Sequence, residues 1–378
     1  MFSHQHVIII GAGVAGVSFS LFLHRAGISS TIYESYPYFK EAGAGFIISP
    51  NGVNVLHELG LKHELEENST ALNQYKIFTH HNEEVSIMNS FDHIKFGCPS
   101  VNITRTHVMK MLLAEAESKG IAVEYGKKLV ALEQSQTNVT AYFEDQTQAI
   151  GTLLVGADGI HSKTREMIFP QGHHLKYGGF WTIQGLVSTE GLGLQNEMLV
   201  FMDKTFSLVV GRCHATENKA LWQGIGLQER KIPAKHFENK TTNALKADLL
   251  NLVDDWQGPV ADIFHNSTNL YPRHLLQFDP LATWSKGRVT LIGDAAHGTS
   301  PNTGQGTSIA LEDAMYLAKM LHEHDYRDAY YYYEFDRKPR INHISKMFEQ
   351  ADPFMLGITD DIFNYQIQWD EEKEFSLK

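Results

Sequence analysis

Apolar residues recur along this chain with two periods. Three short runs rich in Val, Ile and Leu predict buried strands, at 7–10, 153–155 and 289–292, and each run stops at a glycine. Apolar residues at helical spacing then follow from Val17 to Ala26 and from Thr307 to Leu321. Strands that feed directly into helices are typical of an α/β domain.

Two intervening sections favour strands over helices. From 72 to 101 and from 176 to 284, short aromatic and β-branched segments alternate with polar turns, which predicts an inserted and mainly antiparallel sheet. A helix is expected within the second section at Thr242–Leu252. The aromatic tail from Ala329 is predicted to be helical and to pack on the α/β domain, and an amphipathic partner-binding helix is the alternative.

These patterns predict a fold of the α/β class in discontinuous segments. Asn138–Phe143 and Gln148–Val155 are expected to form a hairpin, and Asn51 is expected to cap a helix that Gly60 ends. The predicted boundaries are 1–71, 102–175 and 285–328 for the α/β domain, 72–101 and 176–284 for the inserted domain, and 329–378 for a C-terminal helical segment.

Composition narrows the possible functions. A chain of 378 residues accommodates two domains, and a net charge of −12 argues against a nucleic-acid partner. Cys98 and Cys213 are the only cysteines and lie far apart, so we expect a reducing, cytoplasmic location. The 20 histidines are scattered, which predicts no metal site. The apolar stretch 7–23 lacks a basic start and contains glycines, so neither a signal peptide nor a membrane span is expected.

The first glycine-rich segment points to a dinucleotide. Strand 7–10 runs into Gly11-Ala12-Gly13-Val14-Ala15-Gly16, a complete Gly-x-Gly-x-x-Gly, and a helix follows it. Glu34 ends the next strand, at the spacing where an acid meets the adenosine ribose of a dinucleotide. A glycine-rich turn without a ligand is the alternative, and the placed acid argues against it.

A second glycine-rich segment lies near the other end of the chain. Strand 289–292 stops at Gly293-Asp294, and Gly304, Gly306 and Thr307 then lead into a helix. The partial positive charge and free N–H groups of a helix N-terminus favour a negatively charged ligand that approaches closely. His297 lies in the turn after Asp294, where a structural role is expected rather than that of a base.

A third motif identifies the family that the chain resembles. Strand 153–155 ends in Asp158-Gly159, with Ser162 and Arg165 at fixed offsets; alone, this is also compatible with a strand, a turn and a capped helix. In this order, the three motifs resemble the single-component FAD-dependent aromatic hydroxylases of the p-hydroxybenzoate and salicylate hydroxylase type, which include tetracycline-modifying relatives. The resemblance covers nearly the whole chain and implies a Rossmann-like FAD-binding domain and an inserted substrate domain.

The resemblance also implies which residues hold FAD. Arg105 resembles the basic residue near the ribityl and pyrophosphate, and Arg165 is a candidate for the nicotinamide nucleotide. Gly43 and Gly45 fall in a loop beside the isoalloxazine that would let the flavin swing, with an ordinary glycine turn as the alternative. The implied cofactor-binding residues are Gly11, Gly13, Ala15, Gly16, Glu34, Gly45, Arg105, Asp158, Asp294, Gly304, Gly306 and Thr307.

The implied reaction is a hydroxylation. NADPH or NADH reduces FAD, O2 forms a C4a-hydroperoxyflavin, and one oxygen passes to an aromatic or polycyclic substrate; an FAD-dependent dehydrogenase or reductase that acts without O2 is the alternative. The implied mechanism needs little acid–base chemistry from the protein and assigns no catalytic side chain, and Pro301 and Gly304 would shape the oxygen and flavin site. The expected partners are a small substrate and O2, and the chain is expected to be a monomer or a homodimer.

The substrate residues are predicted less directly than the cofactor residues. Gln184, Phe201, Trp222 and Pro301 are candidates for contact with the substrate, although the strand aromatics are equally compatible with the core of the inserted domain. Two departures from the family pattern matter. Ser35 follows the ribose acid where Arg is common, and Gln184 precedes Gly185 where relatives carry a Trp-Arg-Gly.

Overall fold

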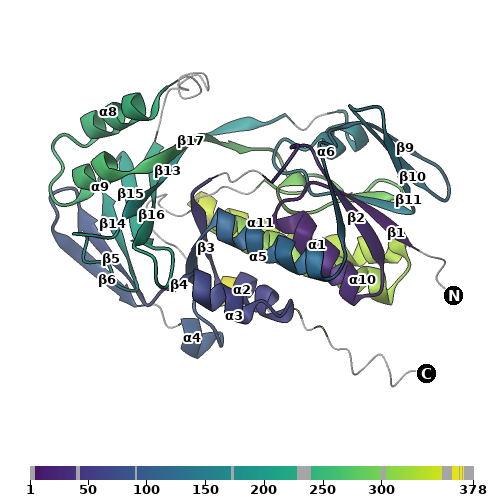
Figure 1. Cartoon of the computed structure of the whole chain (residues 1–378), viewed down its shortest axis with the longest axis horizontal. Helices are drawn as coiled ribbons and strands as arrows, with labels where there is room; N and C mark the ends of the chain where they lie inside the picture. The colour runs from purple at the N-terminus through teal and green to yellow at the C-terminus, as the bar shows by residue number, and fades with distance from the viewer. Residues whose placement is uncertain are drawn as a thin grey trace.

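A computed structural model describes residues 5–39, 43–89, 92–171, 174–227, 240–298, 304–350, 360–365, 367 and 369. Pro301 lies outside the described residues. Within them the strands form four sheets, and helices pack around the sheets (Figure 1). No described helix is both long and apolar enough to cross a lipid bilayer.

A five-stranded parallel sheet lies at the centre of one part of the fold, and its strands come from residues 6 to 291. Its strand order is β18 (Val289–Leu291), β12 (Leu153–Gly156), β1 (His6–Ile10), β2 (Ser29–Glu34) and β8 (Ala122–Tyr125). All neighbouring pairs run parallel, so the carboxyl ends of the three predicted apolar runs meet at one edge of the sheet. Val7, Ile8 and Ile9 are completely buried, as expected for a strand covered on both faces.

Helices cover one face of this sheet and a small antiparallel sheet covers the other. The helices are α1 (Val14–Arg25), α5 (Arg105–Ser118), α10 (Gly306–Glu323) and α11 (Tyr326–Gln350). The small sheet contains β9 (Leu129–Gln134), β10 (Val139–Phe143) and β11 (Gln148–Gly151), and Phe143 stacks on Tyr33 of β2 with ring centroids 4.8 Å apart. Tyr330 and Tyr333 of α11 are buried, so the aromatic tail packs on this domain.

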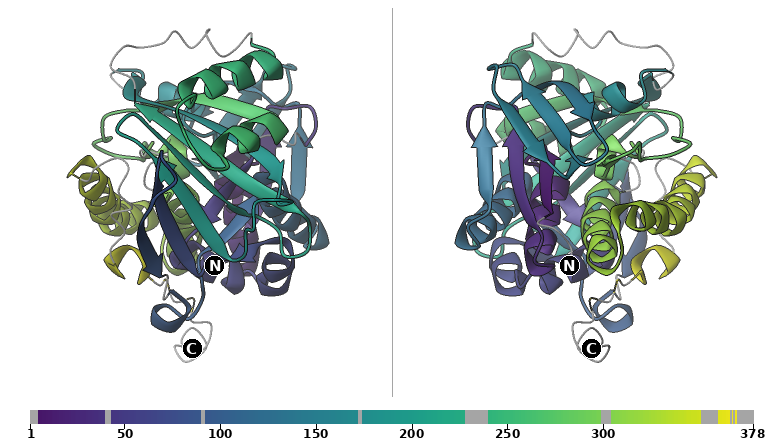
Figure 2. Two further views of the ribbon diagram at one scale, coloured as in Figure 1. Left: turned by 90° about the vertical axis from the view of Figure 1, so that its left-hand side faces the viewer. Right: turned by 90° about the vertical axis from the view of Figure 1, so that its right-hand side faces the viewer.

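A seven-stranded sheet forms the second half. Its order is β17 (Thr268–Gln277), β13 (Lys176–Ser188), β16 (Lys219–Leu227), β15 (Phe206–Arg212), β14 (Glu197–Met202), β5 (Gln74–Thr79) and β6 (Glu84–Asn89). All neighbours pair antiparallel except β14 and β5. Helices α8 (Thr242–Leu252) and α9 (Val260–Asn266) cover the face that points away from α1, α5 and α10 (Figures 1 and 2).

Short elements complete the fold. A three-stranded sheet of β3 (Gly45–Ile48), β7 (Val101–Thr104) and β4 (Thr70–Ala71) lies beside α2 (Pro50–Glu58). The remaining elements are α3 (Lys62–Asn68), α4 (Asp92–Lys95), α6 (Lys163–Ile168), a 3-10 turn at Gly293–Ala295 and α12 (Asp360–Phe363). We propose that the parallel and seven-stranded sheets mark the two domains expected from the sequence.

Two local predictions need correction. Gln148–Val155 is not one arm of a hairpin, because β11 pairs with β10 whereas β12 joins the parallel sheet. Gly151 is the last residue of β11, and a Cβ there would lie 2.8 Å from the carbonyl oxygen of His6, so a larger residue would block the crossing from β11 to β12. The helix that Asn51 was expected to cap begins two residues earlier, because Pro50 occupies its first turn and Ser49 is the N-cap.

Candidate functional site

The three glycines of the Gly11–Gly16 loop have different surroundings: other protein atoms lie close to Gly11 and Gly16, whereas Gly13 faces open space. A Cβ on Gly11, whose φ is +107°, would lie 2.5 Å from the carbonyl oxygen of Ala157, and one on Gly16 would lie 2.0 Å from that of Gly11. A Cβ on Gly13 would meet no described atom within 4 Å. Close packing therefore explains Gly11 and Gly16, whereas Gly13 leaves room for a ligand at the start of α1.

Glu34 lies directly across from this loop. Its Oε2 accepts a hydrogen bond from the backbone N–H of Ala12 at 2.9 Å, and its Oε1 accepts from Ser35 Oγ at 3.0 Å and Tyr36 N at 2.9 Å. The carboxylate is therefore fixed between the loop and the end of β2. Ser35 therefore helps to orient the acid.

The Gly293–Asp294 turn presents a carboxylate at the same edge of the sheet. The Asp294 side chain is accessible to solvent, yet enough protein surrounds the carboxyl that desolvation raises its pKa, while the charges of His297 and Arg105 act in the opposite direction. A Cβ on Gly293 would lie 3.3 Å from Ala15 Cβ and 3.4 Å from Ala310 Cβ. This turn therefore lies against both glycine-led helices, α1 and α10.

Gln305 fixes the start of α10 to the first domain segment. Its amide donates to Ser49 Oγ at 2.8 Å and accepts from Asn51 Nδ2 at 3.3 Å, and all three side chains are buried. A Cβ on Gly304 or Gly306 would meet no described atom within 4 Å. Gly304, Gly306 and the half-buried Thr307 therefore face open space next to the end of β3.

Arg105 links the two acidic positions. Desolvation lowers the pKa of its guanidinium, Arg273 lowers it further, and Asp294 and Glu34 raise it. A Cβ on Gly43 would lie 3.3 Å from Arg105 Cδ and 3.4 Å from Arg273 Nη2. A side chain at Gly43, whose φ of +80° itself favours glycine, would therefore push against both arginines.

Gly45 is not part of a freely moving loop. It is the first residue of β3 and pairs with Thr104 of β7. A Cβ at Gly45 would lie 2.4 Å from the carbonyl oxygen of Ile103 and 2.8 Å from Leu221 Cδ2, so the glycine permits close approach of β3, β7 and the seven-stranded sheet. Tight packing explains this glycine without any need for backbone mobility.

The Asp158-Gly159 motif is used within its own turn and in a link to the Gly293 turn. Asp158 accepts hydrogen bonds from Ser162 Oγ at 2.5 Å, Thr164 N at 2.9 Å and Thr164 Oγ1 at 3.0 Å, which fixes the start of α6. Arg165 is buried and donates to the carbonyls of Ile160 at 2.6 Å and Ala295 at 3.0 Å. The Arg165 guanidinium therefore joins two motifs and is not presented to a nicotinamide nucleotide.

Three buried charges and one partly buried arginine lie behind the Gly293 turn, and their pairing was not predicted from the sequence. Asp313 accepts from Gly293 N at 3.0 Å, His297 Nε2 at 2.5 Å and Arg337 Nε at 2.8 Å. The other pairs in this cluster are Arg337–Glu312 at 2.6 Å and Arg340–Glu312 at 2.6 Å. Their signal in the sequence is Glu312-Asp313 inside an apolar helix, with two arginines three residues apart in the next helix. The contact with Asp313 supports the structural role expected for His297.

The seven-stranded sheet presents polar residues to the Gly43–Gly45 segment, which lies on the side of the parallel sheet. Gln184 Nε2 donates to Gln223 Oε1 at 2.7 Å and to the carbonyl of Gly45 at 3.3 Å. Leu221 and Cys213 form a small apolar cluster with Ala44, and Leu186 and Tyr271 pack against it. Of the predicted substrate residues that the structure describes, Gln184 therefore lies next to the Gly43–Gly45 segment.

Phe201 and Trp222 lie on the opposite face of that sheet. Both are buried in the cluster that α8 and α9 cover; Phe201 stacks on Phe78 at 5.1 Å, and Trp222 Nε1 donates to Ser267 Oγ at 2.6 Å. The structure therefore gives both residues the core position that the sequence left open as an alternative.

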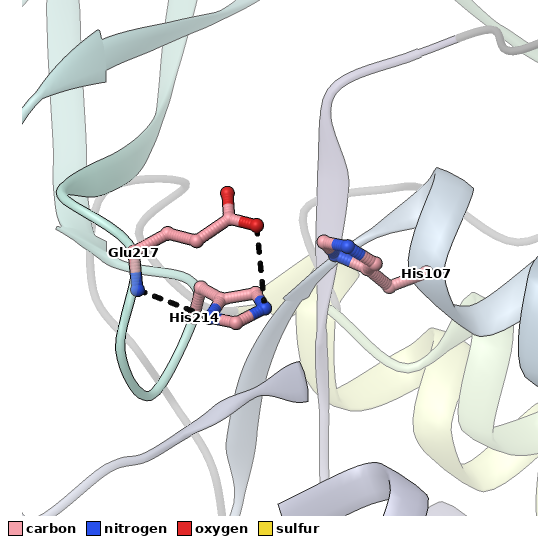
Figure 3. Close-up of side chains that lie close together, drawn as sticks. All are labelled: His107, His214 and Glu217. Atoms are coloured by element: carbon pink, nitrogen blue, oxygen red, sulfur yellow. Dashed lines mark hydrogen bonds and ion pairs between the residues drawn. The ribbon is translucent and has the colours of Figure 1, made fainter. Parts of the chain in front are cut away.

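His107, His214 and Glu217 also come together, as Figure 3 shows, with one potential ligand atom from each within 4.8 Å of the others. His214 Nδ1 accepts from the backbone N–H groups of Thr216 and Glu217, both at 3.2 Å. The proton of the neutral ring is therefore on Nε2, which faces Glu217 Oε1 at 3.7 Å. A metal ligand needs a free lone pair there, so the arrangement favours a polar contact between α5 and the β15–β16 turn.

Comparisons with known proteins agree with this geometry. A family model described as an FAD binding domain matches residues 4–344. The chain is 29% identical to 3-amino-4-hydroxybenzoate 2-monooxygenase PtmB3 of Streptomyces platensis, over 91% of this chain and 87% of that protein. It is 28% identical to an FAD-dependent urate hydroxylase of Klebsiella pneumoniae, over 88% of this chain and 86% of the hydroxylase.

Solved structures share the fold. Klebsiella pneumoniae HpxO complexed with FAD and uric acid superposes with a TM-score of 0.83 at 24% identity, covering 92% of this chain and 87% of HpxO. The tetracycline destructase Tet(51) superposes with a TM-score of 0.71 at 20% identity, covering 91% of this chain and 89% of that protein.

Proposed function

The chain belongs to the FAD binding domain family and is a flavoprotein monooxygenase, and from this premise we propose that it uses NAD(P)H and O2 to hydroxylate an aromatic or polycyclic small molecule. The resemblance drawn from the three sequence motifs is confirmed by the family match. The identity of the substrate and the course of the oxygen transfer belong to the proposal.

One observation carries the proposal: three glycines from opposite ends of the chain border open space at the starts of α1 and α10, two helices that both lie against the Gly293 turn, whereas other glycines of the first loop are crowded. Gly13, Gly304 and Gly306 have room for a ligand, and Gly11 and Gly16 do not. The first helical turns of α1 and α10 bring free N–H groups to that space. This arrangement fits a long anionic cofactor such as FAD.

The residues fit the parts of FAD as follows. We propose that the Gly11–Gly16 loop, including Ala15, holds the pyrophosphate, that Glu34 holds the adenosine ribose, and that Arg105 and Asp294 flank the ribityl chain. Gly304, Gly306 and Thr307 would contact the isoalloxazine ring, and Gly45 would border it. Asp158 would support the site through its turn. Bound FAD supplies the redox chemistry by taking electrons from NAD(P)H and transferring them to O2.

The protein would contribute exclusion of water and orientation of the substrate. Leu186 and Leu221 offer apolar surface, and Gln184 and Gln223 offer amide groups, on the sheet face next to Ala44. Related proteins named for 3-amino-4-hydroxybenzoate and urate support a substrate with an electron-rich ring. Water exclusion matters because reduced flavin and O2 otherwise release H2O2.

The test is a substrate panel with three simultaneous readings. The FAD-loaded protein receives NADH or NADPH with phenolic, heteroaromatic or polycyclic compounds, and one follows nicotinamide oxidation, O2 uptake and H2O2 release. We expect substrate-stimulated oxidation with little H2O2 and a hydroxylated product. Turnover that continues without O2 would instead assign the alternative reductase activity.

A further inference from the structure

Two residues of β17 lie on the sheet face that meets the first domain. In the register of the sheet, Tyr271 pairs with Gln184 and Arg273 pairs with Thr182. Gln184 contacts the carbonyl of Gly45, and Tyr271 packs against the cluster that contains Ala44. Arg273, two residues after Tyr271 on the same strand face, reaches the adjoining glycine, Gly43.

Arg273 and Arg105 converge from different domains. Both side chains come within 3.4 Å of the position that a Cβ on Gly43 would occupy, through Arg105 Cδ at 3.3 Å and Arg273 Nη2 at 3.4 Å. Arg273 acts on Arg105 as a like charge and disfavours its protonated form. Two guanidinium groups that approach in this way favour an anion between or beside them.

The charges around the two arginines differ. Asp294 and Glu34 both act on Arg105, so that guanidinium faces the acids that flank the proposed FAD site. Arg273 is exposed, and among the described residues no hydrogen bond or ion pair engages its guanidinium. By contrast, Arg25 at the surface pairs with Glu58 at 3.3 Å. The charge of Arg273 is thus directed to the junction of the two proposed domains, where no described residue pairs with it.

We propose that Arg273 binds the anionic group of the substrate, so that the substrate class is an aromatic or heteroaromatic acid. This inference rests on the proposed function and specifies its substrate. A guanidinium pairs with a carboxylate through two parallel N–H···O bonds, which also fixes the orientation of the ring. Gln184 and Gln223 supply amide groups for ring substituents, and Leu186 and Leu221 supply surface for the ring face.

The experiment compares acids with their neutral amides. Holoenzyme with bound FAD is titrated with 3-amino-4-hydroxybenzoate, 4-hydroxybenzoate, 2-hydroxybenzoate and nicotinate, each beside its carboxamide, and Kd is read from flavin absorbance. This reading needs no turnover. The variants are Arg273→Gln, Arg273→Lys and the matched control Arg327→Gln, since Arg327 is an exposed arginine on α11.

We expect at least one acid to bind more tightly than its amide, and Arg273→Gln to weaken that acid about ten- to a hundredfold. The Kd of the amide, the Kd of FAD and the KM for NADH and NADPH should change less than twofold. Arg273→Lys should recover part of the loss, because it restores a point charge without the paired geometry. Arg327→Gln should leave every value unchanged.

Several results would overturn the assignment. If Arg273→Gln raised the Kd of FAD, Arg273 would be a cofactor-binding residue. If only the KM for NADH or NADPH rose, Arg273 would bind the nicotinamide nucleotide. If the acid and its amide lost affinity equally, Arg273 would contribute only packing. If the wild-type holoenzyme bound none of the acids, aromatic acids would be excluded as the substrate class. Failure of the proposed function is separate, since it would appear as no substrate-stimulated NAD(P)H oxidation in the wild-type chain.

Discussion

Replacement of Asp313 by asparagine tests whether the buried charges hold the Gly293–Asp294 turn. Asp313 is completely buried and accepts hydrogen bonds from Gly293 N, His297 Nε2 and Arg337 Nε. Asparagine has one acceptor oxygen, so its NH2 group must face a donor on one side. The smallest loss is one charged hydrogen bond, about 1.5–3 kcal/mol, and the largest is a broken buried ion pair, about 3–5 kcal/mol.

The assay is urea unfolding of the apo and FAD-loaded protein, with FAD affinity measured on the same samples. Glu166→Gln is the matched control, because Glu166 is an exposed carboxylate paired with Lys163 and should change stability by less than about 0.5 kcal/mol. We expect Asp313→Asn to lower the free energy of unfolding by about 2–5 kcal/mol and to weaken FAD, since the turn that carries Asp294 loses its acceptor.

The pH dependence gives a second reading of Asp313→Asn. Burial alone would raise the pKa of Asp313, but His297, Arg337 and the hydrogen bond from Gly293 N hold it at about 2, below its ordinary 3.8. A depressed pKa stabilises the folded state above the unfolded value, and this stabilisation is lost as pH falls from about 4 through 2. The difference between wild type and variant should shrink over that window. Equal stability at pH 7, or a difference independent of pH, would refute the reasoning.

Three further substitutions and one labelling experiment test the same geometry. Gly13→Val should abolish FAD binding while the apo protein unfolds as wild type, because only the ligand space is filled; retained FAD would contradict it. Asp294→Ala should weaken FAD about ten- to a hundredfold, the loss of one charged hydrogen bond. Because desolvation raises the Asp294 pKa, the apo variant should be no less stable at pH 7, and a large loss would make this residue structural. Gly45→Val should cost about 1–3 kcal/mol or more of stability through overpacking, and a slower flavin reduction at unchanged stability would restore the mobile-loop interpretation. Burial raises the pKa of Cys213 to about 12, so thiol reagents should modify it at pH 8 only after urea unfolding; rapid labelling of the folded protein would contradict its burial.

The cofactor half of the structure could be predicted because its signals are local. A strand, a glycine at the turn and a helix start occupy neighbouring positions in the sequence, and a Cβ on Gly16 would meet the carbonyl oxygen of Gly11, only five residues earlier. The parallel sheet and helices α1, α5 and α10 accordingly lie where the apolar periods place them. Gly11 and Gly45 differ, because the atoms that crowd them are remote in the sequence and belong to Ala157 for Gly11 and to Ile103 and Leu221 for Gly45.

Long-range charge pairs escaped prediction for a related reason. Asp313 and Arg337 are 24 residues apart, and His297 is 16 residues before Asp313. Nothing in the local pattern distinguishes a charged residue that faces a buried partner from one on a solvated helix face. Only the packing of α10 against α11 and the Gly293 turn removes these groups from water and makes each depend on the others.

The two faces of the seven-stranded sheet show why the substrate residues were the hardest to predict. Successive residues of a strand point to opposite faces, and Gly185 pairs with Trp222 while Gln184 precedes Gly185. Gln184 and Trp222 therefore cannot both face a substrate on one side of the sheet, but this conflict is visible only once the pairing register is known. Which face meets the cofactor domain is then decided by the helices: Leu249 of α8 and Phe264 of α9 join the aromatic cluster that contains Trp222, and the ring centroids of Phe264 and Trp222 lie 5.1 Å apart. The uncovered side carries glutamine, tyrosine and arginine. We therefore propose that polar aromatic acids, and not large apolar rings alone, are tested as substrates.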